Sequence, residues 1–565
     1  MNLLKINEKR VCFMKRRLVS IVTAICVAAP IVAVADTLTW DGGASGNFST
    51  GPWSGGEAGH ETPQDGDTLV FGTVGDFNND LSELSPAGLS MTAAGPVRLG
   101  GNQIALMSGA TISKSGSGTY TNNVPLVLGT ASGQTVYVEV ASGCTIEMLA
   151  AISGDANLVY GNTSTTAGSV NLRADSDYTG TTTIKRGTVR VYANSAFGTS
   201  AAGTTIQNAT KNDAKTGLFF YGVTMNENFT TKLNYDTNAN SNHKPVQFNG
   251  ACKFNGTWTI SASVGGGRIW VLGGSAVHFS GTFSSGQWNT CALFQGTVHY
   301  DGEGSSLGQD DYYGGTIYYN AHCKCPYTMS LGQSASSGWL NMTQTRYFNC
   351  ENAMVYNNST PPVIAFIRGG CAADMCGYDQ TFQVITCASG NSSSVVRSTD
   401  PSTIHLTLPG SSAATCYAKF TGKVSLSFEG PRPMSLGNTA NTSTGSLSLT
   451  NAAAVTLLDG FKWCGSSVTV ADGSTLTVGN ATFPETLAVA INDRVASGGN
   501  GAVSSKIALN ADAVAETLTI NGKTRSGGRT YGATGSGADI VDDDHFSGTG
   551  KLRVRKPCGT FIIIR

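Results

Sequence analysis

Short runs in which apolar and polar residues alternate recur along this chain of 565 residues. Three of them follow one another between Ser169 and Gly198, at Val170/Leu172, Thr182/Ile184 and Val189/Val191. Each run is too short for a helix and has the period of two that places alternate side chains of a β-strand on opposite faces. Gly180 and Gly187 stand at the corners, where Gly187 allows a positive φ angle. Short strands joined by sharp corners predict a chain that coils around itself.

The same alternation returns after residue 440. Aliphatic residues alternate with serine or threonine in Ser446–Leu449, Val455–Leu457, Val468–Val470, Leu476–Val478 and Leu518–Ile520. One face of each strand then enters a core while the other meets water. We interpret these runs as further coils of one solenoid.

The order of residues in the first stretch resembles a known repeat. Tyr178 is followed by Gly180 and Thr181, then by Gly187-Thr188-Val189 and by Asn194-Ser195-Ala196-Phe197-Gly198. This order is similar to the autotransporter-associated β-strand repeat of bacterial passenger domains, although Thr181 and Phe197 replace a glycine and a leucine of that family. The resemblance covers residues 169–198 and implies an exported, all-β, right-handed parallel β-helix.

An aromatic residue followed two positions later by glycine recurs along the chain. The pairs are Tyr178/Gly180, Phe254/Gly256, Phe279/Gly281, Phe420/Gly422 and Phe546/Gly548. The spacing from Phe254 to Phe279 predicts the length of one coil. The spacing from Phe279 to Phe420 does not fit a multiple of that length, and it predicts an insertion or altered coils. We expect roughly 21 coils stacked at ~4.8 Å, with a cap at each end.

The first 35 residues are typical of a secretory signal peptide. Lys15-Arg16-Arg17 precede an apolar run from Leu18 to Ala33, and Ala33-Val34-Ala35 has the small residues of a cleavage site. The run is shorter than the ~20 residues that a spanning helix needs. We therefore expect cleavage before Asp36, no later transmembrane segment, and export to the extracellular space or outer cell surface, with the periplasm as the alternative.

The remaining chain divides into four segments. They are a cap at 36–75, a β-helix with the repeat at 76–251, cysteine- and aromatic-rich coils or an insertion at 252–430, and the last coils with a terminal cap at 431–565. Trp40, Trp53 and Phe71 are expected to close the first end of the coil. Stacking on a sugar is the alternative role of the two tryptophans.

Composition narrows the classes of partner. The chain has 71 glycines and only 13% charged residues, which favours an all-β solenoid over helices or a disordered tail. Removal of the signal peptide takes six basic residues and one acidic residue from totals of 36 and 37, which leaves a net charge near −6. Such a surface lacks the basic stripe that phosphates require, so nucleic acid is excluded as a partner.

Most cysteines of the mature chain lie in the aromatic-rich segment. An exported protein can pair them as disulfides, or they can serve as small buried apolar residues. We expect Cys323 and Cys325 to face opposite sides of a strand. Together with His322, Cys371 and Cys376 they provide zinc-ligand types, but the spacing matches no common zinc motif, and no metal site is predicted.

Aromatic residues of the same segment are candidates for binding. They are Tyr312, Tyr313, Tyr318, Tyr319 and Trp339. Asp310 and Asp311 are catalytic candidates only if the protein is a β-helix polysaccharide lyase or glycoside hydrolase, in which case Ca²⁺ is a conceivable cofactor. Consecutive residues of a strand point to opposite faces, so neither this pair nor the run Asp542-Asp543-Asp544-His545 predicts a catalytic site.

These observations favour a binding protein over an enzyme. We expect an exported, elongated β-helix with a non-catalytic, adhesin-like or structural role and no cofactor. Its polar ladders suit weak, repeated contacts with glycans or other cell-surface or extracellular components. The alternative is the lyase or hydrolase named above.

Overall fold

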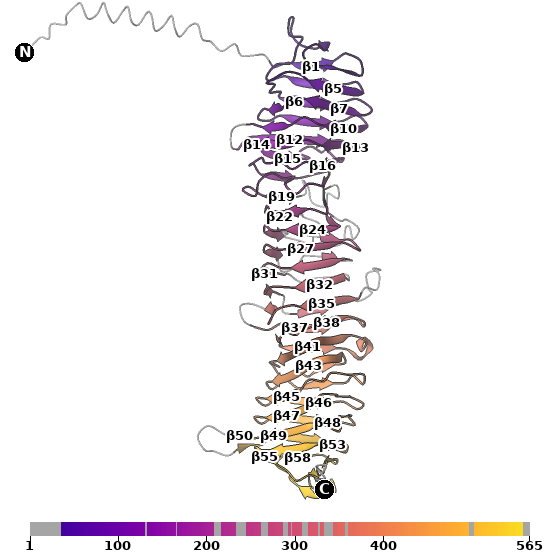
Figure 1. Ribbon diagram of the computed structural model, residues 1–565, viewed down its shortest axis with the longest axis vertical. Helices are drawn as coiled ribbons and strands as arrows, with labels where there is room; N and C mark the ends of the chain where they lie inside the picture. The colour runs from indigo at the N-terminus through magenta and orange to yellow at the C-terminus, as the bar shows by residue number, and fades with distance from the viewer. Residues whose placement is uncertain are drawn as a thin grey trace, which may run out of the picture.

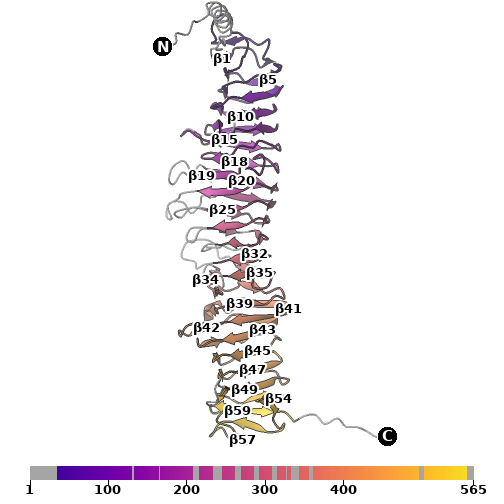
Figure 2. The ribbon, with the colours of Figure 1, turned by 90° about the vertical axis from the view of Figure 1, so that its left-hand side faces the viewer.

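The computed structural model describes residues 35–129, 133–164, 166–207, 216–232, 245–260, 269–285, 292–294, 296–307, 315–325, 328–332, 343–355, 360–495 and 502–556. Within these ranges the protein is an all-β rod of stacked strands that runs from its N-terminal to its C-terminal coils (Figure 1). Figure 2 shows the same stack from the side. No α-helix occurs in the described ranges, and none of their segments is a helix long and apolar enough to cross a membrane.

Long parallel sheets form the walls of the rod. They run from β1 (Thr37–Trp40) to β36 (Met354–Val355), from β2 (Ser45–Asn47) to β29 (Ala292–Phe294), from β21 (Thr224–Met225) to β54 (Thr517–Ile520), and from β34 (Thr328–Leu331) to β58 (Phe546–Ser547). Neighbouring strands of a sheet come from successive coils, and almost all of their pairings are parallel. The predicted all-β parallel solenoid is confirmed. Each coil is called a rung below.

Alternation of side chains explains why these short runs become strands. In β12 (Thr135–Val140), Val136, Val138 and Val140 are buried while the residues between them are partly exposed. The runs predicted after residue 440 behave in the same way in β45 (Leu447–Thr450) and β54. One continuous apolar core therefore fills the rod from end to end.

Rung length varies more than the sequence suggested. Phe254 pairs with Phe279, so this rung has the expected length. Thr297 pairs with Thr316, however, which makes a shorter rung, and Gly315 pairs with Gln344, which makes a longer one. Strands of the third sheet continue through this segment, and their pairings place Phe420 in the column of Val277, two residues before Phe279. Rungs of unequal length and this shift along the strand together account for the irregular spacing between Phe279 and Phe420.

Two glycines of the aromatic-glycine motif, Gly256 and Gly281, mark corners where two rungs touch. A Cβ atom on Gly256 would lie 2.1 Å from the carbonyl oxygen of Glu227, and one on Gly281 would lie 2.1 Å from that of Gly256. The preceding aromatic residues Phe254 and Phe279 are buried. The motif therefore combines a core ring with a corner that has no room for a side chain.

Residues of the repeat at 169–198 also form a buried aromatic ring followed by a tight corner. Tyr178 is buried, and a Cβ atom on Gly180 would lie 2.0 Å from the carbonyl oxygen of Ala156. Gly187 has a φ of 77°, as its corner position predicted. Thr181 donates from its amide and its hydroxyl to the Asn157 side chain of the preceding rung.

Aromatic residues close the N-terminal end. Trp40 and Trp53 are buried, with ring centroids 5.2 Å apart, and Trp53 lies 5.7 Å from Phe71. Strand β3 (Trp53–Ser54) pairs with β1 antiparallel, which ends the parallel ladder. Because both indoles are buried, they pack the cap and offer no face to a sugar.

Cysteines in the described ranges are mostly buried. They are Cys144, Cys252, Cys323, Cys325, Cys350, Cys371, Cys376, Cys387, Cys416 and Cys464. Cys323 and Cys325 are both buried while Lys324 is exposed, so the expectation of opposite faces is wrong. A period of two returns residues i and i+2 to the same side of a strand. These thiols act as small core residues.

A histidine lies between two aspartates near each end of the rod. The Nδ1 and Nε2 atoms of His60 lie 2.6 Å from Asp36 and 2.9 Å from Asp67. His545 lies 2.9 Å from Asp542 and 3.0 Å from Asp493. Burial alone would lower the pKa of each histidine, but the hydrogen bonds and charges of the aspartates outweigh it and raise both pKa values.

Stability of the N-terminal end is expected to be greatest in mildly acidic solution. The raised pKa of His60 gives stability that is present below the unfolded value of about 6.5 and is lost as pH rises through the folded value. The lowered pKa of Asp36 gives stability that is present above about 3.9 and is lost as pH falls through its folded value. Hydrogen exchange of the Thr68 amide, which donates to the Asp36 carbonyl, reports this window.

Two variants distinguish the contribution of His60 to this pH dependence from that of a histidine–carboxylate pair on the exposed surface. His60→Gln is expected to flatten the pH dependence of Thr68 protection, after correction for intrinsic exchange. His322→Gln, which removes an exposed pairing with Glu303, is expected to leave it unchanged. Equal protection of Thr68 at about pH 5.5 and 8.5 in the unaltered chain would contradict the prediction.

Candidate functional site

An ordered row of rings lies on the outside of the third sheet. It is carried by β27 (Ala276–Phe279), β30 (Thr297–Tyr300), β32 (Gly315–Tyr319) and β35 (Gln344–Phe348), which are consecutive in that sheet. His278, His299, Tyr318 and Tyr347 pair in register from rung to rung. We call these four residues the ring row.

Stacking fixes the rings of this row. Centroids of His278 and His299 are 3.9 Å apart, those of His299 and Tyr318 are 4.4 Å apart, and those of Tyr318 and Tyr347 are 4.5 Å apart. The planes of neighbouring rings differ by no more than 8°. Neighbouring rings therefore cover one another's faces, and all four residues are partly exposed.

Tyr318 lies on the outer surface as a binding residue requires, but Tyr319 does not. The side chain of Tyr319 is buried, stacks on Tyr300, and accepts a hydrogen bond from Arg346 at 3.2 Å. Successive residues of a strand face opposite sides, so the pair cannot form one surface. The prediction of Tyr319 as a binding residue is therefore corrected.

Other predicted site residues fall outside the part of the chain that the structure describes. They are Asp310, Asp311, Tyr312, Tyr313 and Trp339.

A row of polar side chains runs beside the ring row. Asp301, Asn320 and Asn349 follow β30, β32 and β35 in successive rungs. Asn320 donates from its amide nitrogen to Asp301 at 2.5 Å, and Asn349 donates to the Asn320 side-chain oxygen at 2.6 Å. The Nδ1 atom of His278 lies 2.9 Å from the other carboxylate oxygen of Asp301. The two rows thus form one hydrogen-bonded surface.

Electrostatics at the start of the ring row favour a neutral imidazole beside a carboxylate. Burial, with His278 as a smaller cause, lowers the pKa of His299 to about 4. Burial alone would raise the pKa of Asp301, but hydrogen bonds from Asn320 and His278 outweigh it and lower the pKa. At neutral pH, His299 is therefore uncharged and Asp301 is ionised.

An ion pair borders the far end of the row. Arg397 donates from Nε to Asp374 at 2.8 Å and from a terminal nitrogen to the Tyr347 hydroxyl at 3.3 Å. Asp374 pairs in register with Tyr347, and Arg397 pairs with Asp374. At this register position of the sheet, the aromatic ring of Tyr347 is therefore followed by the charged side chains of Asp374 and Arg397 in the next two rungs.

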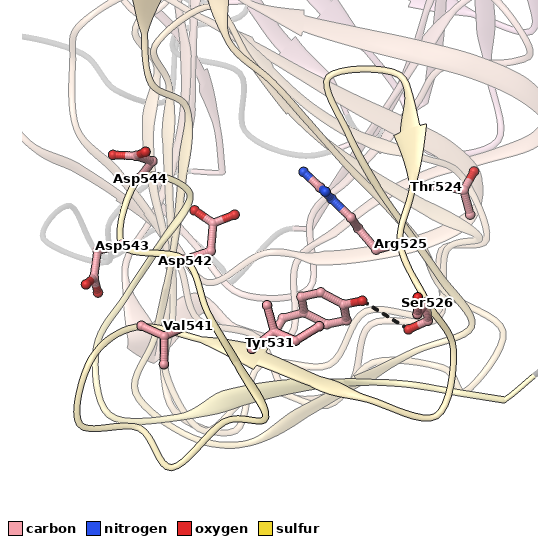
Figure 3. A pocket seen from close by; sticks show the side chains of 9 residues that line it. Thr524, Arg525, Ser526, Tyr531, Val541, Asp542, Asp543 and Asp544 are labelled. Atoms are coloured by element: carbon pink, nitrogen blue, oxygen red, sulfur yellow. Dashed lines mark hydrogen bonds between the residues drawn. The ribbon is translucent and has the colours of Figure 1, made fainter.

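A pocket of about 470 Å³ lies at the C-terminal end of the rod. Figure 3 shows Arg525 and Asp542 on facing sides of it, with Tyr531 donating to the Ser526 carbonyl at 3.1 Å. Asp542 lies against His545, and Asp543 accepts hydrogen bonds from the amide and hydroxyl of Thr534.

The three neighbouring carboxylates do not converge on one point in this pocket. Asp543 and Asp544 point away from the side on which Asp542 faces Arg525 (Figure 3). The hydrogen bonds of Asp542 and Asp543 hold the turn that leads into β58. Asp542 and Asp543 thus make the kind of turn contacts that the sequence favoured for this run.

The binding candidates predicted from the sequence did not include His278, His299 or Asp301. Val277-His278-Phe279 and Val298-His299-Tyr300 repeat the same order of residues, followed by Ile317-Tyr318-Tyr319. This order of an aliphatic residue, an outward ring and an inward ring was the available signal. Unequal rung lengths concealed it.

Comparison of the whole chain with protein-family models, with curated proteins and with solved structures finds no match.

Proposed function

We propose that this protein is an exported, elongated β-helix that binds extended ligands along its outer face without converting them. The observation that carries the proposal is the in-register surface formed by the ring row and by Asp301, Asn320 and Asn349. It presents hydrogen-bonding groups at the spacing of successive strands, about 4.8 Å. Glycans of the cell surface or its surroundings carry hydroxyl groups along their whole length and suit such a surface.

Repetition compensates for the weakness of each contact. Tyr318 and Tyr347 are partly exposed and carry hydroxyl groups, and the neighbouring Asn320 and Asn349 carry amides. Each contact competes with water and is weak by itself. Several contacts made by one polymer act together, because the first one raises the effective concentration for the next. This reasoning supports an adhesin-like or structural role.

Export rests on residues 1–35 and has support at the proposed cleavage point. The backbone nitrogen of Asp36 lies 3.1 Å from a carboxylate oxygen of Asp67, and that aspartate is buried. Cleavage before Asp36 would turn this nitrogen into an ammonium group beside a buried negative charge. The new terminus would therefore gain an ion pair at the first end of the rod.

Loss of two tyrosines tests the binding surface. Tyr318→Ala with Tyr347→Ala is expected to weaken co-sedimentation with insoluble polysaccharides by ~10-fold or more, because two adjacent contacts are lost together. The chain is mixed with a polysaccharide panel in Ca²⁺ or chelator, and release of new reducing or unsaturated ends is followed in parallel. Retention without release is the expected result for the unaltered chain.

A second stacked tyrosine pair provides the matched control. Tyr192 directly follows β18 (Thr188–Val191) and stacks at 4.6 Å on Tyr221 of β20 (Gly217–Tyr221), and both strands belong to a different sheet. Replacement of both tyrosines by alanine is expected to leave retention unchanged. Equal loss in both double variants would show that the ring row is not the binding surface. Release of new ends would instead establish the lyase or hydrolase alternative.

A further inference from the structure

Three side chains with metal-binding atoms converge at the start of the ring row. His278 and His299 pair in register on β27 and β30, and Asp301 directly follows β30. One nitrogen of each histidine and one oxygen of Asp301 all lie within 4.8 Å of one another. All three residues are partly exposed, so an ion can reach them from solution. No other such group occurs in the described ranges.

We propose that His278, His299 and Asp301 bind one divalent transition-metal ion of the zinc, copper or nickel class. Two imidazole nitrogens and one carboxylate oxygen are a donor set that these ions prefer, whereas Mg²⁺ and Ca²⁺ prefer oxygen ligands alone. The inference is independent of glycan binding, because it rests on a different chemistry at one end of the same surface.

One pair of ligand atoms already lies near the spacing of a metal site, and the third ligand has to move closer, since the three atoms lie within 4.8 Å of one another. The Nδ1 atom of His278 is 2.9 Å from Asp301, within hydrogen-bond distance. Two metal bonds of about 2.1 Å that meet at roughly 90–110° place their donor atoms roughly 3.0–3.4 Å apart. A metal ion can therefore take the place of the hydrogen bond between His278 and Asp301, and binding requires the partly exposed imidazole of His299 to turn toward it.

Neighbouring residues hold the ligands in place. Asn320 donates to the Asp301 oxygen that does not face His278, and Asn349 in turn donates to Asn320. Tyr318 stacks on the imidazole of His299. Hydrogen bonds and packing of this kind orient ligands and strengthen metal binding.

A positive charge in the neighbouring rung restricts the kind of ion. Lys253 pairs in register with His278, one rung before it in the same outward column. Its charge opposes capture of a cation by electrostatic attraction alone. Ions that form coordinate bonds to nitrogen overcome this repulsion better than hard ions do.

Metal titration of the chain tests the proposal. The chain is purified without a histidine tag, stripped with chelator and titrated with Zn²⁺, Co²⁺, Mg²⁺ or Ca²⁺. We expect one Zn²⁺ to bind with a dissociation constant of about 1–10 μM, with Co²⁺ competing and Mg²⁺ and Ca²⁺ not competing. His278→Ala or His299→Ala is expected to lower zinc affinity by ~100-fold, and Asn320→Ala by ~10-fold.

The control is an exposed histidine elsewhere on the same sheet. His405 lies on β41 (Val395–Leu406). The His405→Ala variant is expected to bind Zn²⁺ like the unaltered chain. Absence of binding at about 100 μM Zn²⁺ would overturn the proposal. Unchanged affinity in both histidine variants, or a thiolate-to-cobalt charge-transfer band, would also overturn it by assigning the ion to other residues. Glycan retention of the chelated chain is measured separately, so failure of one proposal does not decide the other.

Discussion

Gly281→Ala is expected to open the middle of the rod locally. Gly281 stands at the corner between β27 and β28 (Phe283–Ser285), where a Cβ atom would lie 2.1 Å from one backbone carbonyl oxygen and 2.6 Å from another. Backbone atoms cannot yield as a flexible side chain can, so the two rungs must move apart. We expect a cost of about 3 kcal/mol or more in local stability.

Native-state hydrogen exchange measures this cost rung by rung. A long solenoid opens in parts, so one global unfolding energy does not describe it. The amide of Ser280, which donates to the Phe254 carbonyl, should lose protection, while amides near Trp40 should keep theirs.

Gly100→Ala is the matched control for the change at Gly281. Gly100 lies in β7 (Val97–Gly101), and a Cβ atom there would meet nothing within 4 Å. We expect a change within about 0.5 kcal/mol or a slight gain in stability. Similar losses in both variants would show that contact between rungs does not explain the motif.

The strands were predictable because each needs only a local pattern. Polar and apolar residues alternate in Thr517–Ile520, and in β54 the apolar residues are buried while the threonines are exposed or partly exposed. The aromatic-glycine motif at Phe254 and Phe279 could also be recognised in the sequence, because a buried aromatic residue and a tight glycine corner occur within three residues. Such local rules specify the fold without any knowledge of distant partners.

The candidate site was only partly predictable because it depends on register. Tyr318 was singled out, but its stacking partner His299 lies one rung earlier in the chain, and His278 lies one rung before that. The rung that joins Thr297 to Thr316 is shorter than the one that joins Gly315 to Gln344, so a constant period cannot bring these residues together. Because the corners vary in length, residues that meet in neighbouring rungs are not separated by a constant number of residues in the sequence.

Glu227→Gln is expected to stabilise the rod at alkaline pH. Glu227 lies in the corner before β22 (Phe229–Lys232) and its side chain is 2% exposed. Burial raises its pKa to about 8, so the folded protein holds a proton that the unfolded chain has released above pH 4.5. Stability therefore falls as pH rises from 4.5 to about 8, because the folded state binds more protons than the unfolded state in this range.

Glutamine keeps the shape of the side chain and removes this titration. At about pH 8 the variant should gain roughly 2–4 kcal/mol of local stability over the unaltered chain, and near pH 5 the two should differ little. Hydrogen exchange of the Phe229 amide, which donates to the Thr257 carbonyl, measures the difference beside the substituted residue.

Glu303→Gln provides the control for Glu227→Gln, because the Glu303 side chain is 69% exposed. It removes the same charge where water already solvates the carboxylate, so Phe229 protection should not change. A parallel pH dependence in the unaltered chain and in Glu227→Gln would mean that another group carries the titration. If Phe229 protection depends on pH in the unaltered chain but not in Glu227→Gln, then ionisation of Glu227 causes the loss of local stability at alkaline pH.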